Sequence, residues 1–363
     1  MALKAHKIAL RPTDAQVVWF QRQCGYARFA FNSALADFKA GLSDGVFRSF
    51  IDLNNRWNER KKELDWAGEQ DQRAALYGVK NLSDAVERWQ KKQNGFPKFK
   101  KRDSRQSYTV EGYQCSVDGK RIKLPKIGTV KMFSELRFEG KIKRVTVSRT
   151  AHRWFASILV DTGTPNVPRD TRGLPVVGID VGINTLATLD DGTKYENPRP
   201  LKQYERKLAR EQRKLSRKVF LSKNWYKQKQ IVERIHYRIA CIRRDAHHKA
   251  TTAIVKSAAK IGIETLSVTN LFRNKNLAKA LSDAALGGFL EKLKTKAETL
   301  GIPVVQADRF FASSKTCSSC GHKKDDLTLS DRHYHCSHCG ASIDRDVNAA
   351  INLRNLAAGY AES

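Results

Sequence analysis

The sequence lacks a long apolar run. No stretch approaches the length of a membrane span. The first residues, Met-Ala-Leu-Lys-Ala-His-Lys, contain no continuous apolar signal segment. We therefore expect the chain to stay in the cytoplasm, a reducing compartment in which disulfides are rare.

Acidic residues are few: 37 Asp and Glu stand against 67 Lys and Arg, which gives a net charge of +30. A surface so cationic repels itself unless it meets a polyanion, and nucleic acid is the commonest one. A ribosome-like structural protein and a binder of anionic membranes are weaker alternatives, because 40% hydrophobic content and six tryptophans indicate globular cores. For 363 residues we expect two or three domains.

Cysteine is scarce outside one segment. Three of the seven cysteines, Cys24, Cys115 and Cys241, are isolated, and we expect unpaired, buried thiols there. The other four form two Cys-x-x-Cys pairs separated by fifteen residues, namely Cys317, Cys320, Cys336 and Cys339. Four thiolates at this spacing favour one closed, tetrahedral zinc site of structural type. A minor alternative is that His335 or His338 replaces one cysteine.

The N-terminal part has helical periodicity. Thr13-Asp-Ala-Gln16 is a capping-box pattern, and apolar residues then recur at helical spacing up to Gly41, which we expect to end the helix. Residues 47–93 continue a polar helical pattern, so a small helical bundle is predicted. At Gly95-Phe-Pro-Lys-Phe-Lys-Lys-Arg102 aromatic residues alternate with cations, which suits stacking on bases and contact with phosphates. A basic surface linker is an equally good reading of that segment.

Short β segments follow from about residue 107 to residue 160, with a hairpin turn expected at Asp118-Gly119. Such regular short strands suggest a small barrel or sandwich, of which oligonucleotide-binding barrels are one case. Residues 162–175, with three prolines and two glycines, are expected to form a linker.

Beyond the linker, apolar strands alternate with helices, which predicts an α/β domain. Two strands are expected in Val176–Leu189, and one helix of about fifty residues from Arg199 to Lys249, where 17 Lys or Arg and 4 Asp or Glu give +13. That one-sided charge favours phosphate contact. Further predictions are a strand around Lys260–Val268, a helix from Asp283 to Leu300, a strand at 302–307 and a closing helix at 344–358.

Three carboxylates stand at suggestive places: Asp180 on the first strand, Glu264 in the middle of a later strand and Asp346 near the start of the last helix. Carboxylates are the ligands that hard cations need, and such a set can hold two magnesium ions about 3.5–4 Å apart. Each acid taken singly is more often a cap or a surface ion pair. For Asp344 and Asp346, helix N-capping stays an open alternative.

These motifs, in this order, resemble the TnpB family of insertion-sequence proteins, which are relatives of type V CRISPR effectors. The resemblance runs nearly from end to end. It rests on Arg11-Pro-Thr13, Gly25-Tyr-Ala-Arg-Phe29 with Asn32, Gly95-Phe-Pro-Lys-Phe-Lys100, Gly178-Ile-Asp180-Val-Gly182, Ile263-Glu264-Thr-Leu, Thr316-Cys-Ser-Ser-Cys-Gly321 and Asp344-Arg-Asp-Val-Asn-Ala-Ala350.

The resemblance implies a multidomain α+β fold. It consists of an RNase H-like (RuvC) α/β nuclease domain with a zinc-ribbon insertion, preceded by an oligonucleotide-binding-like β-barrel, the wedge, that carries an inserted helical bundle. The implied parts are the wedge at 1–10 and 105–165, the helical recognition domain at 11–104, the nuclease domain at 166–311 and 341–363, and the zinc ribbon, a target nucleic-acid-binding insertion, at 312–340.

The family also implies an activity: RNA-guided hydrolysis of DNA, with a short motif beside the target read by the protein. Asp180, Glu264 and Asp346 would be the catalytic acids and would hold two Mg2+ or Mn2+ ions, and the four paired cysteines would hold one structural Zn2+. The implied partners are a guide RNA derived from the transposon and double-stranded target DNA, in a prokaryotic, nucleoid-associated setting and with no membrane. Candidate nucleic-acid contacts are Phe96, Lys98, Phe99, Lys100, Lys101, Arg102, Arg206, Arg210, Arg213 and Arg217.

Three other functions are compatible with parts of this pattern. A catalytically inactive guided or zinc-ribbon DNA-binding repressor would need no acids, whereas all three are present. A DNA-strand-transferring transposase uses similar acids, so the residues alone do not separate it from a hydrolase. An actin-like ATPase also uses a Gly-Ile-Asp-x-Gly strand, but the net charge and the cysteines are then unexplained and no second glycine-rich Asp-Gly-Gly-Thr loop is present.

Overall fold

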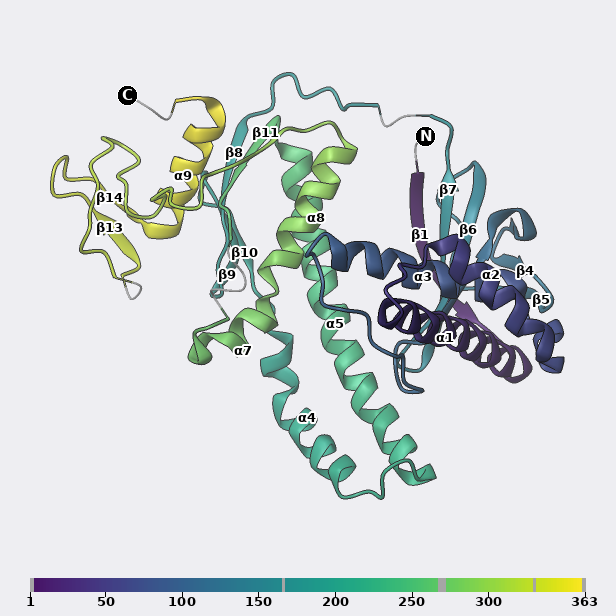
Figure 1. Ribbon diagram of the computed structural model, residues 1–363. Helices are drawn as coiled ribbons and strands as arrows, with labels where there is room; N and C mark the ends of the chain where they lie inside the picture. Colours follow the sequence, from purple (N-terminus) through teal and green to yellow (C-terminus); the bar gives the residue numbers. More distant parts are fainter. Residues whose placement is uncertain (1–2, 165–166, 267–271, 329–330, 361–363) are drawn as a thin grey trace. The chain divides into compact units, whose positions relative to one another are not determined.

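The structure, a computed structural model, describes residues 3–164, 167–266, 272–328 and 331–360. The chain divides into two compact units, Met1–Pro165 and Asn166–Ser363, and Figure 1 shows their elements. In the described residues no helix is long and apolar enough to cross a membrane. The finer division into four domains that the sequence suggested stays a prediction.

A seven-stranded antiparallel sheet organises the first unit, in the order β2-β6-β7-β1-β5-β4-β3. Its N-terminal strand β1 pairs with β7 on one side and with β5 on the other, so the start of the chain closes a sheet made by much later residues. The hairpin turn expected at Asp118-Gly119 is confirmed, because Asp118 pairs with Arg121 and Gly119 has a φ of +50°. The strands are β1 (Leu3–Arg11), β2 (Ser107–Glu111), β3 (Ser116–Asp118), β4 (Arg121–Leu124), β5 (Gly128–Met132), β6 (Lys141–Thr150) and β7 (Arg153–Asp161).

Three α-helices pack with this sheet: α1 (Asp14–Ser43), α2 (Phe50–Arg60) and α3 (Gln72–Gln90). Short 3-10 turns lie at Lys61–Glu63, Asp65–Glu69 and Gly112–Gln114. The capping box of Thr13 and Gln16 is confirmed. The expected end of α1 at Gly41 was wrong, since the helix continues to Ser43. A Cβ at Gly41 would lie 2.7 Å from the carbonyl oxygen of Val46, so this glycine permits close contact with the returning chain.

The second unit is built on a five-stranded sheet in the order β10-β9-β8-β11-β12. Strands β8, β11 and β12 run parallel, and β9 and β10 continue the sheet antiparallel. Glu264 was predicted to lie inside a strand; β11 instead ends at Ile263, so Glu264 is the first residue beyond it. The strands are β8 (Val176–Asp180), β9 (Thr185–Leu189), β10 (Lys194–Glu196), β11 (Lys260–Ile263) and β12 (Val304–Gln306).

Where one long basic helix was predicted, the chain forms a hairpin of two, α4 (Pro200–Ser216) and α5 (Lys223–Ser257) (Figure 1). The buried carboxylate of Glu211 accepts a hydrogen bond from the Gln228 side chain at 2.8 Å and so joins the two helices. The side-chain oxygen of Ser222 caps the second helix. The single helix predicted from Arg199 to Lys249 was wrong, because the chain leaves the helix after Ser216 and begins a new one at Lys223.

The helix predicted at 283–300 is also interrupted. Asp283 belongs to α7 (Lys275–Ala284), Ala285 has a φ of +51°, and α8 (Leu286–Thr299) begins directly after it. Helices α5 and α8 share a hydrophobic core with Val177 and Ile179 of β8. The closing helix α9 (Arg345–Ala358) packs against β8 and β11 through a different set of residues.

Candidate metal sites at the sheet edge and in the cysteine hairpin

Asp180 and Glu264 follow neighbouring parallel strands to the same edge of the sheet. Ile179 of β8 is paired with Ile263 of β11, so the two carboxylates occupy the next position on each chain. Ligands of open α/β sheets bind outside the carboxyl ends of the strands. Both acids are partly exposed, so the position that the fold gives them is open to a ligand.

The third acid is brought there by glycines. A Cβ at Gly178 would lie 1.8 Å from the carbonyl oxygen of Ala350, and one at Gly262 would lie 2.1 Å from that of Leu353. Helix α9 therefore rests on bare backbone in β8 and β11, a closeness that any other residue would prevent. Because side chains alternate along a strand, Asp180 shares the face of Gly178, which is the face that α9 covers.

Asp346 lies one helical turn before Ala350 and so at the end of α9 that reaches the carboxylates. The N-cap of this helix is Asp344, whose Oδ1 accepts hydrogen bonds from the backbone N–H groups of Asp346 at 2.9 Å and Val347 at 3.2 Å. Its Oδ2 accepts one from Lys194 Nζ at 2.7 Å. The capping alternative thus applies to Asp344, which leaves the Asp346 side chain free of that role.

The three acids interact electrostatically. Burial, followed by the charges of Glu264 and Asp346, holds the pKa of Asp180 well above its ordinary value. Burial raises the pKa of Glu264 to about 7. Carboxylates crowded in this way resist ionising together, and a divalent cation between them would remove the conflict. Arg345 acts in the opposite direction and favours the charged form of Asp180.

A further carboxylate, Asp190, supports this arrangement. Asp190 follows β9, and its Oδ1 accepts a hydrogen bond from the backbone N–H of Gly178 at 2.9 Å. Its Oδ2 accepts one from Arg354 Nη1 of α9 at 3.3 Å. Asp190 therefore ties the strand that bears Asp180 to the helix that bears Asp346.

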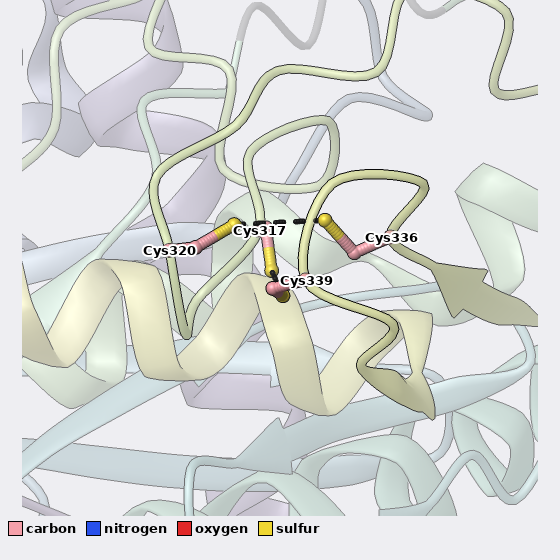
Figure 2. Close-up of side chains that lie close together, drawn as sticks. All are labelled: Cys317, Cys320, Cys336 and Cys339. Carbon is pink, nitrogen blue, oxygen red and sulfur yellow. Dashed lines mark hydrogen bonds between the residues drawn. The ribbon is translucent and has the colours of Figure 1, made fainter.

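The four paired cysteines converge from two turns. Cys317 and Cys320 lie in a turn closed by the bridge of Thr316 with Lys323, and Cys336 and Cys339 lie between β13 (His333–His335) and β14 (Ser342–Asp344); the two turns together are called the cysteine hairpin below. Their Sγ atoms all lie within 4.8 Å of one another; among the described residues this is the one such group of three or more potential ligands. Figure 2 shows the sulfurs turned toward one another from two loops. The three carboxylates are therefore gathered less tightly than the thiols.

The spacing of the sulfurs fits one metal ion. Cys317 Sγ lies 3.7 Å from Cys339 Sγ, and Cys320 Sγ lies 3.6 Å from Cys336 Sγ. Zn–S bonds of about 2.3 Å in a tetrahedron place sulfurs about 3.8 Å apart, whereas a disulfide needs about 2.05 Å. Backbone N–H groups of Cys339 and His338 lower the pKa of Cys336 to about 6 and so favour its thiolate. The cluster could hold a zinc ion.

Two asparagines of α9 join the cysteine hairpin to the helix of Asp346. The backbone N–H of Ser318 donates to Asn348 Oδ1 at 2.9 Å, and Asn348 Nδ2 donates to the carbonyl of Thr316 at 2.7 Å. Asn352 Nδ2 donates to the carbonyls of Ser313 at 2.8 Å and Thr316 at 2.7 Å. These bonds flank Cys317, so the two sites share one structural support.

The candidate nucleic-acid contacts have unequal surroundings. Lys98, Phe99, Lys101 and Arg102 are exposed. Arg206, Arg210, Arg213 and Arg217, on or next to α4, are exposed as well. Phe96 instead packs edge-on against Trp89, with ring centroids 5.0 Å apart. Lys100 lies over the ring of Phe31, 3.7 Å from its centroid.

The residues that support the acids carry no sequence pattern that predicts this role. Asp190 belongs to the Asp-Asp-Gly turn after β9, and Asn348 belongs to the motif that includes Asp346. The sequence does not indicate which distant residues these two side chains bond to. The second glycine, Gly262, lies in an apolar run where glycine marks a close approach of another backbone. Read together, Gly178 and Gly262 would have indicated a helix across two neighbouring strands.

The fold and these sites define an α/β protein with a carboxylate-lined sheet edge and a four-cysteine cluster, joined to a β-rich unit. Family models match three parts of the chain. They are described as “Probable transposase” (OrfB of IS605, residues 157–275), “Cas12f1-like, TNB domain” (residues 287–353) and “Helix-turn-helix domain” (residues 1–41). The described part of that last match forms β1 and most of α1.

Full-length relatives match as well. The chain is 33% identical over 381 residues to “Putative RNA-guided DNA endonuclease InsQ” of Escherichia coli K12, covering 99% of this chain and 93% of the relative. It is 36% identical over 373 residues to “Putative RNA-guided DNA endonuclease” of Streptomyces pristinaespiralis, covering 99% of this chain and 90% of the relative. The chain belongs to the TnpB family, as its motifs indicated.

A solved structure shares the fold. The protein chain of a complex described as Cas12f1 with sgRNA and target DNA superposes with a TM-score of 0.56 at 16% identity. The match covers 94% of this chain and 83% of that one. This similarity supports the mixed α/β architecture with several sheets.

Proposed function

We propose that this protein is an RNA-guided DNA endonuclease that hydrolyses phosphodiesters at the sheet edge formed by Asp180, Glu264 and Asp346. The observation that carries the proposal is the docking of α9 on Gly178 and Gly262, which directs three acids from distant parts of the sequence to one edge. The names of the full-length relatives support the same activity.

The donor set suits hard divalent cations. Asp180, Glu264 and Asp346 would hold two Mg2+ or Mn2+ ions, which supply an activated water and stabilise the leaving oxygen of the phosphodiester when bound. The chain's own contribution is rigidity: Asp344 caps α9, and Asp190 fixes this helix against β8. Lys194, held by Asp344, adds a cation near the acids.

In this proposal the five-stranded sheet with its helices is the RuvC-like nuclease domain. The cysteine hairpin is the zinc ribbon, with one structural Zn2+ on four thiolates that leave no open position for water. The sheet of the first unit is the wedge, and α1–α3 form the inserted recognition helices. The match to the TNB description over residues 287–353 supports the role of the ribbon in target binding.

Sequence specificity would come from base pairing between a transposon-derived guide RNA and the target strand. The protein would read a short motif beside the target and hold the nucleic acid by its phosphates. With a net charge of +30, binding should weaken steeply as salt rises. The exposed arginines of α4 are suited to such contacts.

The proposal is tested with the chain purified together with its RNA, which is sequenced to define the target. In Mg2+, wild type should cut a matching DNA duplex, and Asp180→Ala should lose cleavage by at least about a thousandfold while binding the duplex as before. Asp170→Ala, which removes an exposed acid paired with Arg172, is the matched control. Cleavage that survives Asp180→Ala would overturn the proposal.

One observation favours a second candidate, a transposase that transfers strands, because the family model over residues 157–275 is described as a transposase. The products separate the two functions. Hydrolysis leaves free ends at the target, whereas strand transfer joins a donor end to it. Sequencing the product ends from the same reaction distinguishes these outcomes, and RNA that consists only of random fragments would count against guided cleavage.

A further inference from the structure

The turn between α4 and α5 exposes apolar side chains. Val219, Phe220 and Leu221 are 79%, 69% and 53% exposed, although turns that meet water are usually polar. In the described residues, none of the three belongs to the small core between the two helices. Figure 1 shows this turn at the end of the hairpin that points away from the sheet of the second unit. Contiguous exposed apolar surface of this kind marks an interaction site.

The backbone of this turn is well defined. The N–H of Ser222 donates to the carbonyl of Val219 at 3.1 Å, which makes Phe220 and Leu221 the central residues of the turn. Leu221 has a φ of +63°, a conformation for which turns favour glycine. The side-chain oxygen of Ser222 then accepts from the backbone N–H of Trp225 at 3.1 Å and so begins α5. Hydrogen bonds therefore fix the chain around Phe220, although its side chain lies in solvent.

Three aromatic rings meet beside the turn. The ring centroids of Phe220 and Trp225 lie 5.0 Å apart, and those of Trp225 and Tyr226 lie 5.1 Å apart, both in edge-on contact. Trp225 is half-buried and already carries the ammonium of Lys229, 5.0 Å from its ring centroid. Phe220 is by far the most exposed of the three rings and keeps most of its surface for a partner. Residues 219–221 with Trp225 and Tyr226 are called the helical tip below.

The charges around the helical tip have one sign. From Gln212 to Val232 the chain contains seven Lys or Arg and no Asp or Glu. Four exposed arginines at intervals of three or four residues share one face of α4 and lead to the tip, namely Arg206, Arg210, Arg213 and Arg217. Within the described part of the chain, only Arg210 of these four has an acidic partner, Glu211. The eleven residues from the first to the last arginine span about 16 Å of helix.

An exposed ring at the end of a row of cations suits a nucleic-acid strand. Bases stack on aromatic rings, and the phosphates between them contact cations. An anionic membrane also attracts rings and cations, but it would take up only the outermost 5–10 Å or so, which leaves most of the arginine row without a partner. Bases inside a duplex are covered by their neighbours, so the favoured partner is a strand whose bases are unpaired.

We propose that the helical tip binds unpaired bases of a single-stranded nucleic acid, with one base stacked on Phe220 and the neighbouring phosphates held by the arginine face of α4. The inference rests on the proposed function in so far as that strand is the guide or an opened strand of the target. Because every base has a π face, the site is independent of sequence. RNA and DNA share this chemistry, so the test includes both.

The test measures binding of the full chain, freed of copurifying RNA, to fluorescent 20-nucleotide single strands of mixed sequence, one of RNA and one of DNA. A third strand has the DNA backbone but no bases. Phe220→Ala should weaken binding of the strands with bases by roughly 5- to 150-fold, the effect of one stacked base, and should leave binding of the abasic strand unchanged. A loss confined to RNA or to DNA would support the site and identify its strand. An equal loss on the abasic strand, or no loss at all, would overturn the proposal.

Two further variants separate stacking from simple apolar contact. Phe220→Tyr keeps an aromatic ring and should bind like wild type, whereas Phe220→Leu keeps only an apolar side chain and should bind like Phe220→Ala. Equal binding by Phe220→Tyr and Phe220→Leu would overturn the stacking. The matched control is Tyr113→Ala, which removes an equally exposed ring from the first unit and should leave binding unchanged. Thermal unfolding of each variant checks that the fold is intact.

The phosphate contacts have their own variant. Arg217→Gln should reduce the slope of log affinity against log salt by about 0.7, the share of one phosphate contact on a single strand. Phe220→Ala should leave that slope unchanged. The control is Arg172→Gln, since this exposed arginine is already paired with Asp170. Equal slopes for the two arginine variants would overturn the phosphate contact.

The remaining arms address other partners and the proposed function. Binding to phosphatidylserine vesicles that is lost in Phe220→Ala, with unchanged binding of the strands, would replace the strand by a membrane. A change from dimer to monomer in Phe220→Ala, again with unchanged strand binding, would assign the tip to a second copy of the chain. Strand binding that depends on Phe220 in a chain that cuts no DNA would refute the proposed function alone. Guided cleavage with strand binding independent of Phe220 would refute the base site alone.

Discussion

The two candidate metal sites of this protein are built in opposite ways. The four cysteines lie within residues 317–339, and their sulfurs come together from two neighbouring turns. The three acids are drawn from residues 180–346; the pairing of β8 with β11 brings Asp180 and Glu264 to one sheet edge, and the docking of α9 brings Asp346 toward them. The cysteine site can be predicted from the spacing of nearby residues. The carboxylate site depends on the packing of a whole domain.

The two sites should also differ in the substitutions that they tolerate. The thiols lie in two turns close in the sequence, and the first of these turns is also bonded to Asn348 and Asn352 of α9. The acids require bare backbone at Gly178 and Gly262, the Asp344 cap and the Asp190 brace. We therefore expect damage to the sheet to spare the cysteine cluster, and damage to the cysteine cluster to reach the acids through Asn348.

The largest effect should come from filling the contact beneath α9. Gly178→Ala places a methyl group where the Ala350 carbonyl already lies, so the free energy of unfolding should fall by about 3 kcal/mol. One zinc ion per chain should still bind to the cysteines. Denaturant unfolding and metal analysis measure the two quantities.

The matched control is Gly288→Ala in α8, where a Cβ would meet only the Lys292 ammonium at 3.7 Å. Alanine favours a helix over glycine by up to about 1 kcal/mol, so this variant should be unchanged or slightly more stable. A Gly178→Ala protein as stable as this control would show that α9 does not rest on β8 as described.

The second effect concerns the cysteine cluster. Cys317→Ser should lower the zinc content from one ion per chain to nearly none, because three thiolates hold zinc far less tightly than four. The melting temperature of this variant should be lower than that of wild type. Cys241→Ser, at an isolated thiol outside the cluster, should retain the full zinc content. Zinc content that is equal in both variants would contradict the four-thiolate site.

The third effect tests the link between the two sites. Asn348→Ala leaves the backbone N–H of Ser318 without its acceptor, and the Thr316 carbonyl keeps only the hydrogen bond from Asn352. The cost should be about 2 kcal/mol of the free energy of unfolding. If the hairpin and α9 act as one unit, cleavage in Mg2+ should fall as well, although Asn348 touches neither set of metal ligands directly. An unchanged free energy of unfolding would show that the Asn348 hydrogen bonds do not contribute to stability.

The last effect is absent at neutral pH and concerns the packing of α5, which bears His247, in the second unit. Burial, followed by the charge of Lys292, lowers the pKa of His247 to about 4. Above about pH 6.5 the imidazole is neutral in both the folded and the unfolded chain. As the pH falls from 6.5 to 4 only the unfolded chain takes up the proton, so stability is lost across that window.

His247→Gln removes this titration while retaining a group that can donate to the Ala284 carbonyl, 3.0 Å from His247 Nε2. The variant should therefore lose less stability than wild type between pH 6.5 and 4. Urea unfolding at several pH values measures the difference. Parallel curves for the two proteins would mean that His247 titrates normally in the folded state.

The sequence was sufficient to predict those structural features that depend on a few adjacent residues. The capping box of Thr13, the turn at Asp118-Gly119 and the cysteine pairs were each read from a few adjacent residues, and the structure agrees with them. Charge and periodicity located the basic helices but missed the break between α4 and α5. The Ser222 cap is a local signal of that break, whereas the contact that joins the two helices, Glu211 with Gln228, links residues seventeen positions apart.

The carboxylate site could be predicted only in part from the sequence. The strand of Asp180 and the helix of Asp346 follow from apolar patterns, and their association came from resemblance to a family. The sequence does not state that β8 and β11 are neighbours, nor that Asp190 accepts from Gly178 and Arg354. Those facts arise from sheet pairing and helix docking, which bring together residues far apart in the chain.

The central claim is that Asp180, Glu264 and Asp346 surround common divalent ions. The most direct measurement replaces Mg2+ with Fe2+ in the zinc-loaded protein and adds ascorbate and peroxide, so that hydroxyl radicals cut the backbone beside bound iron. Mass spectrometry of the fragments should locate cuts near residues 180, 264 and 346 together, all lost in Asp180→Asn. Cuts beside one acid alone, or a pattern that Asp180→Asn leaves unchanged, would contradict the account.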